Sequence, residues 1–192
     1  MEELQRINIK VYLQDPQSLS SEEAFRVFNE WIVDNTDEVL VDVADYDHVG
    51  NGPLTLLIGH EANYSLDSDL GEMGLLYTRK QPQGGELSER LAGALRAALR
   101  ACHRLETATE LAGKVAFRGG DLKITANDRL RAPNTEDGER ALREALDPVL
   151  TALFCSASYA VERDTSSGER LSLRVRAEGD FTPETLLANL AN

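Results

Sequence analysis

Residues 27–78 contain eleven carboxylates and two of the chain's three histidines, but no Lys or Arg. Carboxylates and imidazoles are the side chains that most often transfer protons or bind cations. Negative charge at this density must be solvated, paired with basic groups from elsewhere, or neutralised by a bound cation. We call residues 27–78 the acidic segment, and its chemistry is the first question the sequence poses.

The first cluster of polar side chains contains Asp45, Asp47 and His48. A histidine beside a carboxylate can act as a general acid or base. Acidic turns are more often solvated or paired, and a meander of the neighbouring strands would bring Arg79 and Lys80 to the same end. We therefore expect a salt-bridge network here, with an acid–base site at Asp45 and His48 as the alternative.

The second cluster begins with His60 and Glu61, which close an apolar stretch. A histidine in this position is more often a hydrogen-bonded core residue than a metal ligand. The pattern is not that of a zinc protease helix, because such a helix needs a second histidine where Tyr64 stands. A cation-dependent enzyme that uses His60 and Glu61 as acid–base groups remains the alternative.

Asp67, Asp69 and Glu72 follow and supply oxygen ligands of the kind that Ca²⁺ and Mg²⁺ prefer. Their spacing departs from that of an EF-hand loop in its glycine position and in its terminal Glu. We expect a hydrogen-bonded turn, and the alternative is a bound Ca²⁺ or Mg²⁺.

The two clusters cannot share one ion if the strands form hairpins. Residues 54–60 read as a strand, and six steps of roughly 3.3 Å each separate its ends by about 20 Å. The first cluster lies near the start of this strand, whereas His60 and Glu61 lie at its far end.

Composition narrows the classes of partner. The net charge is -13, and an acidic body disfavours both nucleic-acid binding and attraction to anionic membranes. Cys102 and Cys155 lie among apolar residues and read as buried, reduced thiols. With no signal-peptide pattern at residues 1–10, the expected location is the cytoplasm.

Apolar periodicity predicts the elements that position these clusters. Strands are expected at 7–13, 38–43, 54–60, 73–79, 114–117, 122–125, 156–162 and 170–176. Gly119 and Gly120 predict a hairpin turn. Helices are expected after the capping box of Ser20 and Glu23, at 86–112, at 136–154 with a bend or break at Pro148, and after Thr182.

Arg96, Arg100 and Arg104 recur every four residues on the predicted helix 86–112. Such a row is usually a solvated helix face. The alternative is that the row packs against the acidic segment or binds an acidic partner.

This order of elements predicts an α+β fold. We expect a mainly antiparallel, mixed sheet of about seven to eight strands covered by three to four helices. Residues 1–192 suit a single compact unit, and two subdomains, 1–112 and 113–192, are the alternative.

The strings at residues 41–49, 52–53, 57–64 and 74–80 resemble a family of uncharacterised bacterial proteins. The resemblance covers about 40 residues of the first half and implies no activity, cofactor or partner. It directs attention to one set of candidate ligand-binding residues: Asp45, His48, His60, Glu61, Tyr64, Tyr77 and Arg79.

The sequence contains no phosphate-binding glycine loop, nucleophile elbow or Cys/His zinc spacing. We therefore expect a non-enzymatic binding or interaction protein with an acidic surface region, whose partner is a protein or a small molecule. The cation-dependent enzyme described above is the second hypothesis. A structural subunit of a homo-oligomer, held by an apolar self-association surface, is the third.

Overall fold

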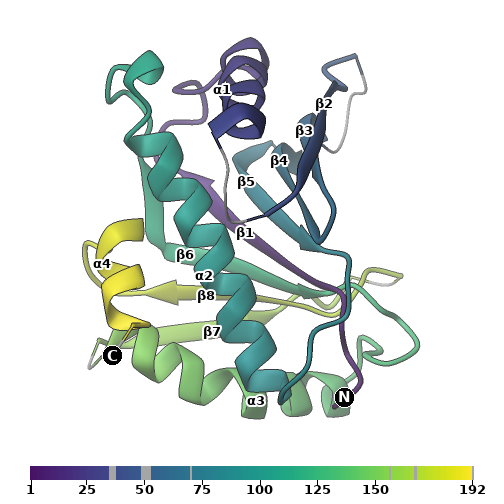
Figure 1. Cartoon of the computed structure of the whole chain (residues 1–192). Helices are drawn as coiled ribbons and strands as arrows, with labels where there is room; N and C mark the ends of the chain where they lie inside the picture. Colours follow the sequence, from purple (N-terminus) through teal and green to yellow (C-terminus); the bar gives the residue numbers. More distant parts are fainter. Residues whose placement is uncertain (35–37, 49–52, 70, 156, 167, 192) are drawn as a thin grey trace.

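In the described part of the chain, eight strands form one antiparallel sheet in the order β2-β3-β4-β5-β1-β6-β8-β7 (Figure 1). The computed structural model describes residues 1–34, 38–48, 53–69, 71–155, 157–166 and 168–191. The strands are β1 (Ile7–Leu13), β2 (Leu40–Asp45), β3 (Pro53–Gly59), β4 (Ala62–Asp69), β5 (Glu72–Arg79), β6 (Phe117–Ala126), β7 (Tyr159–Arg163) and β8 (Ser172–Ala177). The predicted α+β class is confirmed.

The α-helices are α1 (Ser21–Asp34), α2 (Leu87–Glu106), α3 (Glu136–Phe154) and α4 (Pro183–Asn189). Their starts follow local chemistry. The Ser20 hydroxyl accepts a hydrogen bond from the Glu23 amide, and Glu23 accepts one from the Ser20 amide, as the capping-box spacing predicted. The Thr182 side chain caps α4 in the same way by accepting from the Thr185 amide.

The helices pack on one face of the sheet, which we call the covered face. α1 contacts β2 and β3, α2 contacts β1 and β5, and α4 contacts β6, while α3 packs against α2 and α4 (Figure 1). Alternate residues of β1, including Ile7, Ile9 and Val11, are fully buried beneath α2. Because side chains alternate along a strand, Lys10 and Tyr12 point to the opposite face, which we call the open face.

One strand was not predicted. Residues 62–69 read as a loop, but they form β4 between β3 and β5. Figure 1 shows β2 to β5 as a meander that is strongly twisted relative to β6, β8 and β7. An additional strand reverses the direction of β5, so the ends of β5 are exchanged relative to the expectation.

The predicted hairpin at Gly119 and Gly120 was wrong, because both glycines lie inside the single strand β6. A Cβ on Gly119 would lie 2.3 Å from the carbonyl oxygen of Phe181, and the Gly119 amide donates to that oxygen at 3.1 Å. Glycine is therefore needed because the segment before α4 approaches the strand closely, and not because the chain turns there.

Three further expectations concern single positions. α3 continues through Pro148. Cys102 is buried as predicted, but Cys155 is exposed at the end of α3, so the expectation for Cys155 was wrong. Among the described residues, no helix is long and apolar enough to cross a lipid bilayer.

Candidate functional site

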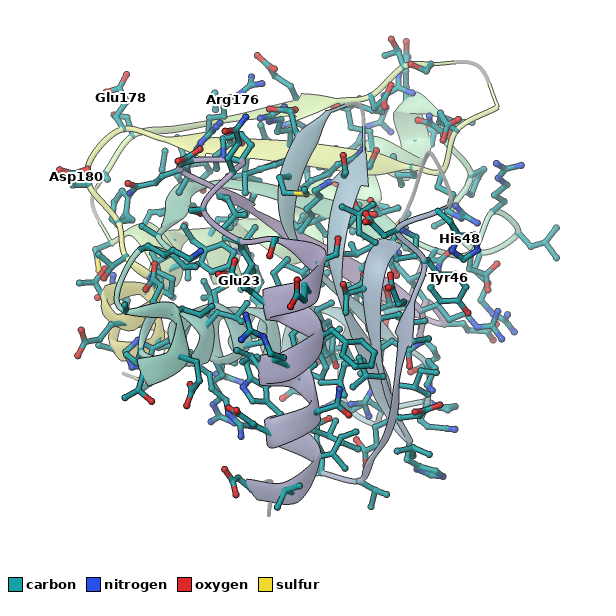
Figure 2. The ribbon with its side chains drawn as sticks, turned by 90° about the horizontal axis from the view of Figure 1, so that it is seen from above. Glu23, Tyr46, His48, Arg176, Glu178 and Asp180 are labelled. Carbon is teal, nitrogen blue, oxygen red and sulfur yellow. The ribbon has the colours of Figure 1, made fainter. Side chains whose placement is uncertain are left out.

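The first cluster is a solvent-exposed turn at the end of β2. Asp45 accepts a hydrogen bond from the Asp47 amide at 2.9 Å, and Asp47 accepts one from the Ser21 hydroxyl at 3.1 Å. The rings of Tyr46 and His48 stack with their centroids 6.5 Å apart. Figure 2 shows Tyr46 and His48 at the periphery of the molecule, on the side away from Glu178 and Asp180.

Arg79 and Lys80 do not reach this turn, so the predicted salt-bridge network with Asp45 and Asp47 was wrong. Arg79 lies opposite Ala62 at the other end of the meander. Its guanidinium forms an ion pair with Glu61 at 3.0 Å, and the Lys80 amide donates to the Glu61 carbonyl at 2.9 Å. The extra strand β4 is the cause, because it turns β5 around.

His60 and Glu61 form the turn between β3 and β4. The His60 side chain is exposed, so the expectation of a core histidine was wrong. Its amide donates to the Val39 carbonyl at 2.8 Å and so ties the turn to the start of β2. Neither His48 nor His60 lines any of the cavities described below.

The three candidate cation ligands are placed on strands that flank the next turn. Asp67 forms a 2.5 Å ion pair with Lys10, and Glu72 forms a 2.6 Å ion pair with Arg174. The side chain of Asp69 lies outside the described residues. Within the described ranges, no group of three or more His, Cys, Asp or Glu side chains is arranged to hold a metal ion. The Ca²⁺ or Mg²⁺ site stays a prediction.

Three of the candidate ligand-binding residues do come together, on the covered face. Tyr64 of β4 and Tyr77 of β5 lie opposite each other, and their ring centroids are 5.4 Å apart. Arg79 follows two residues after Tyr77 and therefore points to the same face. These side chains line a cavity of about 260 Å³ between the meander, α1 and α2.

Arginines of α2 form the opposite wall of this cavity. Arg100 and Arg104 are one turn apart, and the Arg104 guanidinium lies 4.6 Å from the centre of the Trp31 ring. A cation held over an indole face is stabilised by the ring quadrupole. Two members of the predicted arginine row thus pack toward the acidic segment, as the alternative interpretation proposed.

We call this cavity the arginine pocket. Its lining consists of Trp31, Glu38, Tyr64, Tyr77, Arg79, Ala97, Arg100, Ala101 and Arg104. Glu38 is the single carboxylate among these lining residues and accepts a hydrogen bond from the Tyr64 hydroxyl at 2.7 Å. Three guanidiniums against one carboxylate make the lining positive, although the chain as a whole is strongly negative.

The two phenols are fixed in their protonated form. Burial raises the pKa of Tyr64 well above its ordinary value, and the hydrogen bond to Glu38 adds to the effect. Burial also raises the pKa of Tyr77. A phenol has one O–H to donate, and that of Tyr64 is already donated to Glu38. Of the two hydroxyls, that of Tyr77 can serve as a donor to an anion.

Sequence reasoning missed Trp31 and Glu38 as members of this site. Trp31 is one of the buried apolar residues of α1, and the Arg104 guanidinium also packs on its ring. Glu38 was one of eleven similar carboxylates, and nothing in its spacing distinguished it. The one signal in the sequence was the recurrence of arginine every four residues on α2.

The chain matches no family model, no curated protein and no solved structure.

Proposed function

We propose that the chain is a non-enzymatic, cytoplasmic binding protein that holds a small organic anion in the arginine pocket. The observation that carries this proposal is the excess of guanidiniums over carboxylates in one cavity of a chain with net charge -13. Even when Glu61, the ion-pair partner of Arg79, is counted, cations exceed carboxylates. Guanidiniums match the geometry of carboxylate and phosphate groups and bind them through paired hydrogen bonds.

The cavity volume and its aromatic walls define the class of ligand. At about 260 Å³ the pocket lies just below the range of roughly 300–1,000 Å³ that is typical of drug-sized ligands. Trp31, Tyr64 and Tyr77 supply apolar surface for the body of the molecule. A small carboxylate or phosphate monoester with an apolar or aromatic body fits both features.

Binding is favoured over turnover by the state of the tyrosines. A general base must take up a proton near neutral pH, and burial moves the pKa of Tyr64 and Tyr77 away from that range. The exposed His48 and His60 do not line the pocket, so these proposed acid–base groups would not contact a ligand bound there.

The test is thermal unfolding of the full chain with benzoate, citrate or inorganic phosphate at matched ionic strength. An anion that binds the native state raises Tm by mass action. Arg100→Gln removes one exposed guanidinium from the pocket, and we expect affinity to fall about tenfold, in line with the loss of one charged hydrogen-bonding group. Arg96→Gln is the matched control, because Arg96 lies one turn earlier on α2 and outside the pocket.

Three outcomes would overturn the proposal. The first is the absence of a Tm shift with every anion. The second is an equal response of the Arg100→Gln and Arg96→Gln variants. The third is turnover of a bound anion that His48→Ala or His60→Ala abolishes, which would favour the enzyme.

A further inference from the structure

Three cations lie side by side on the open face, across three neighbouring strands. Lys10 of β1 lies opposite Lys123 of β6, and Lys123 lies opposite Arg174 of β8. Like charges at directly opposite positions destabilise a sheet. An arrangement of this kind needs compensating carboxylates, and their positions decide what else the face can bind.

Arg174 is fully engaged within the chain. Its guanidinium contacts Glu72 at 2.6 Å and Asp121 at 2.8 Å, and it lies 4.4 Å from the centre of the Tyr12 ring. Hydrogen bonding to Asp121 and Glu72 raises its pKa far above the ordinary value. We therefore assign Arg174 a positioning role, which holds the Tyr12 ring and one end of the cation row in place.

The ion pair of Lys10 and Asp67 is buried although no described helix covers it. Lys10 is 3% exposed and Asp67 is 5% exposed. Desolvating two charges is costly, and apolar residues of similar size at such positions are often equally or more stabilising. The 2.5 Å bond uses one of the three donors of the ammonium group and one of the two carboxylate oxygens.

Two adjoining cavities hollow the open face beside this pair. A cavity of about 230 Å³ is lined by Lys10 and Asp67, and one of about 200 Å³ is lined by Tyr12 and Arg174. Lys123, Asp164 and Ser172 line both cavities, so the two lie next to each other. We call the combined space the open-face trough.

The charge of the trough differs from that of the arginine pocket. The larger cavity is lined by three cations and by three carboxylates: Lys10, Lys123, Arg170, Asp67, Asp164 and Glu169. Hydrogen bonds from Ser166 lower the pKa of Asp164, so this carboxylate stays ionised. Balanced, fixed charges of both signs favour a ligand that carries both signs itself.

We infer that the open-face trough binds a small zwitterion of the free α-amino acid class. The ligand carboxylate lies between the ammonium groups of Lys10 and Lys123, which line the same cavity. The ligand ammonium group donates to the second oxygen of Asp67 and to Asp164. The proposal is independent of the arginine pocket, because the two sites lie on opposite faces of the sheet.

The test measures Tm shifts of the full chain with a panel of free amino acids and two blocked derivatives of each. N-acetyl amino acids lack the ammonium group, and amino acid amides lack the carboxylate. We expect at least one free amino acid to raise Tm and its two blocked forms to bind at least tenfold more weakly, because each blocked form lacks one of the two charged groups that bond to the trough.

Lys123→Gln should lower the affinity for that amino acid at least tenfold. Arg118→Gln is the matched control, because Arg118 is also a cation of β6 but lies outside both cavities. Arg100→Gln should leave amino acid binding unchanged, which separates this proposal from the function proposed above.

A double variant separates loss of binding from loss of folding. Lys10→Met with Asp67→Leu removes both buried charges together, so the protein should stay folded and yet no longer bind the amino acid. The inference is overturned if no free amino acid shifts Tm. It is also overturned if the blocked forms bind as well as the free one, or if the double variant binds normally.

Discussion

The carboxylates of the acidic segment have different environments on the two faces of the sheet. On the covered face, Glu38 and Glu61 lie beside a larger number of guanidiniums, and the Glu61 side chain is 54% exposed. On the open face, Asp67 is buried and bonded to a buried lysine, and positive and negative groups balance. Asp45 and Asp47, in the turn at the end of β2, are solvent-exposed.

This difference shows that a charge-dense sequence need not make a charge-dense surface. Strand alternation sends successive side chains of β4 to opposite faces, so Tyr64 and Asp67 enter unrelated environments. The compensating cations come from outside the acidic segment: Lys10 from β1, Arg79 from the end of β5, and Arg174 from β8. Of the three possible fates of the acidic charge, pairing and solvation are both present.

The substitution expected to have the largest effect on stability is Lys10→Met. It leaves the Asp67 carboxylate buried without its partner, which should lower the free energy of unfolding by about 3–5 kcal/mol. Glu61→Gln breaks the ion pair of the covered face and should cost less than about 1 kcal/mol, because the Glu61 side chain is 54% exposed and solvent screens the pair. Urea unfolding of both variants gives the two values. Equal costs would show that the two faces do not differ.

The fold was largely predictable because apolar residues recur at a clear helical or strand spacing in most elements. The start of α1 and the bounds of α3 follow directly from capping residues and apolar spacing. β4 carries the same kind of signal, since Ala62, Tyr64 and Leu66 alternate with polar residues and are buried. Its Asn, Ser and Asp residues favour loops, so the segment was predicted as a loop. That one error reversed the predicted direction of β5.

The sites were less predictable because they depend on which strands become neighbours. Lys10 lies between apolar residues of the predicted strand 7–13, and a lysine in such a strand is usually exposed. Its burial arises because Asp67 of the unpredicted strand and Tyr12 surround it. Tyr64, Tyr77 and Arg79 were named as candidates. The spacing of Arg100 and Arg104 allowed packing against the acidic segment as an alternative, but it did not indicate which residues they would face.

A smaller test of the covered face is Tyr64→Phe. The substitution keeps the ring and removes the hydroxyl that donates to Glu38 at 2.7 Å. Losing one hydrogen bond to a charged acceptor should lower the free energy of unfolding by about 1–2 kcal/mol, less than the loss of Lys10. The same variant should weaken anion binding in the arginine pocket, because the Glu38 carboxylate loses the hydrogen bond that offsets part of its charge and then repels the anion more strongly. An unchanged affinity for the anion would remove Tyr64 from the site.

The smallest expected effect concerns an exposed ion pair at the start of α1, where Lys114 lies 2.6 Å from Glu23. Hydrogen bonding to Lys114 is the main cause that lowers the pKa of Glu23 from 4.5 to about 2. A carboxyl whose pKa is lowered by folding stabilises the native state above its unfolded value and loses that contribution as the pH falls through its folded value.

Lys114→Met should therefore cost less than about 1 kcal/mol at neutral pH, because the Lys114 side chain is 44% exposed and solvent screens the pair. The difference between the wild-type chain and the variant should shrink as the pH falls from 4.5 to about 2. It should also shrink at neutral pH in about 1 M salt, which screens exposed charges but not the buried pair of Lys10 and Asp67. A difference that stays constant with pH would show that Lys114 acts through packing and not through its charge.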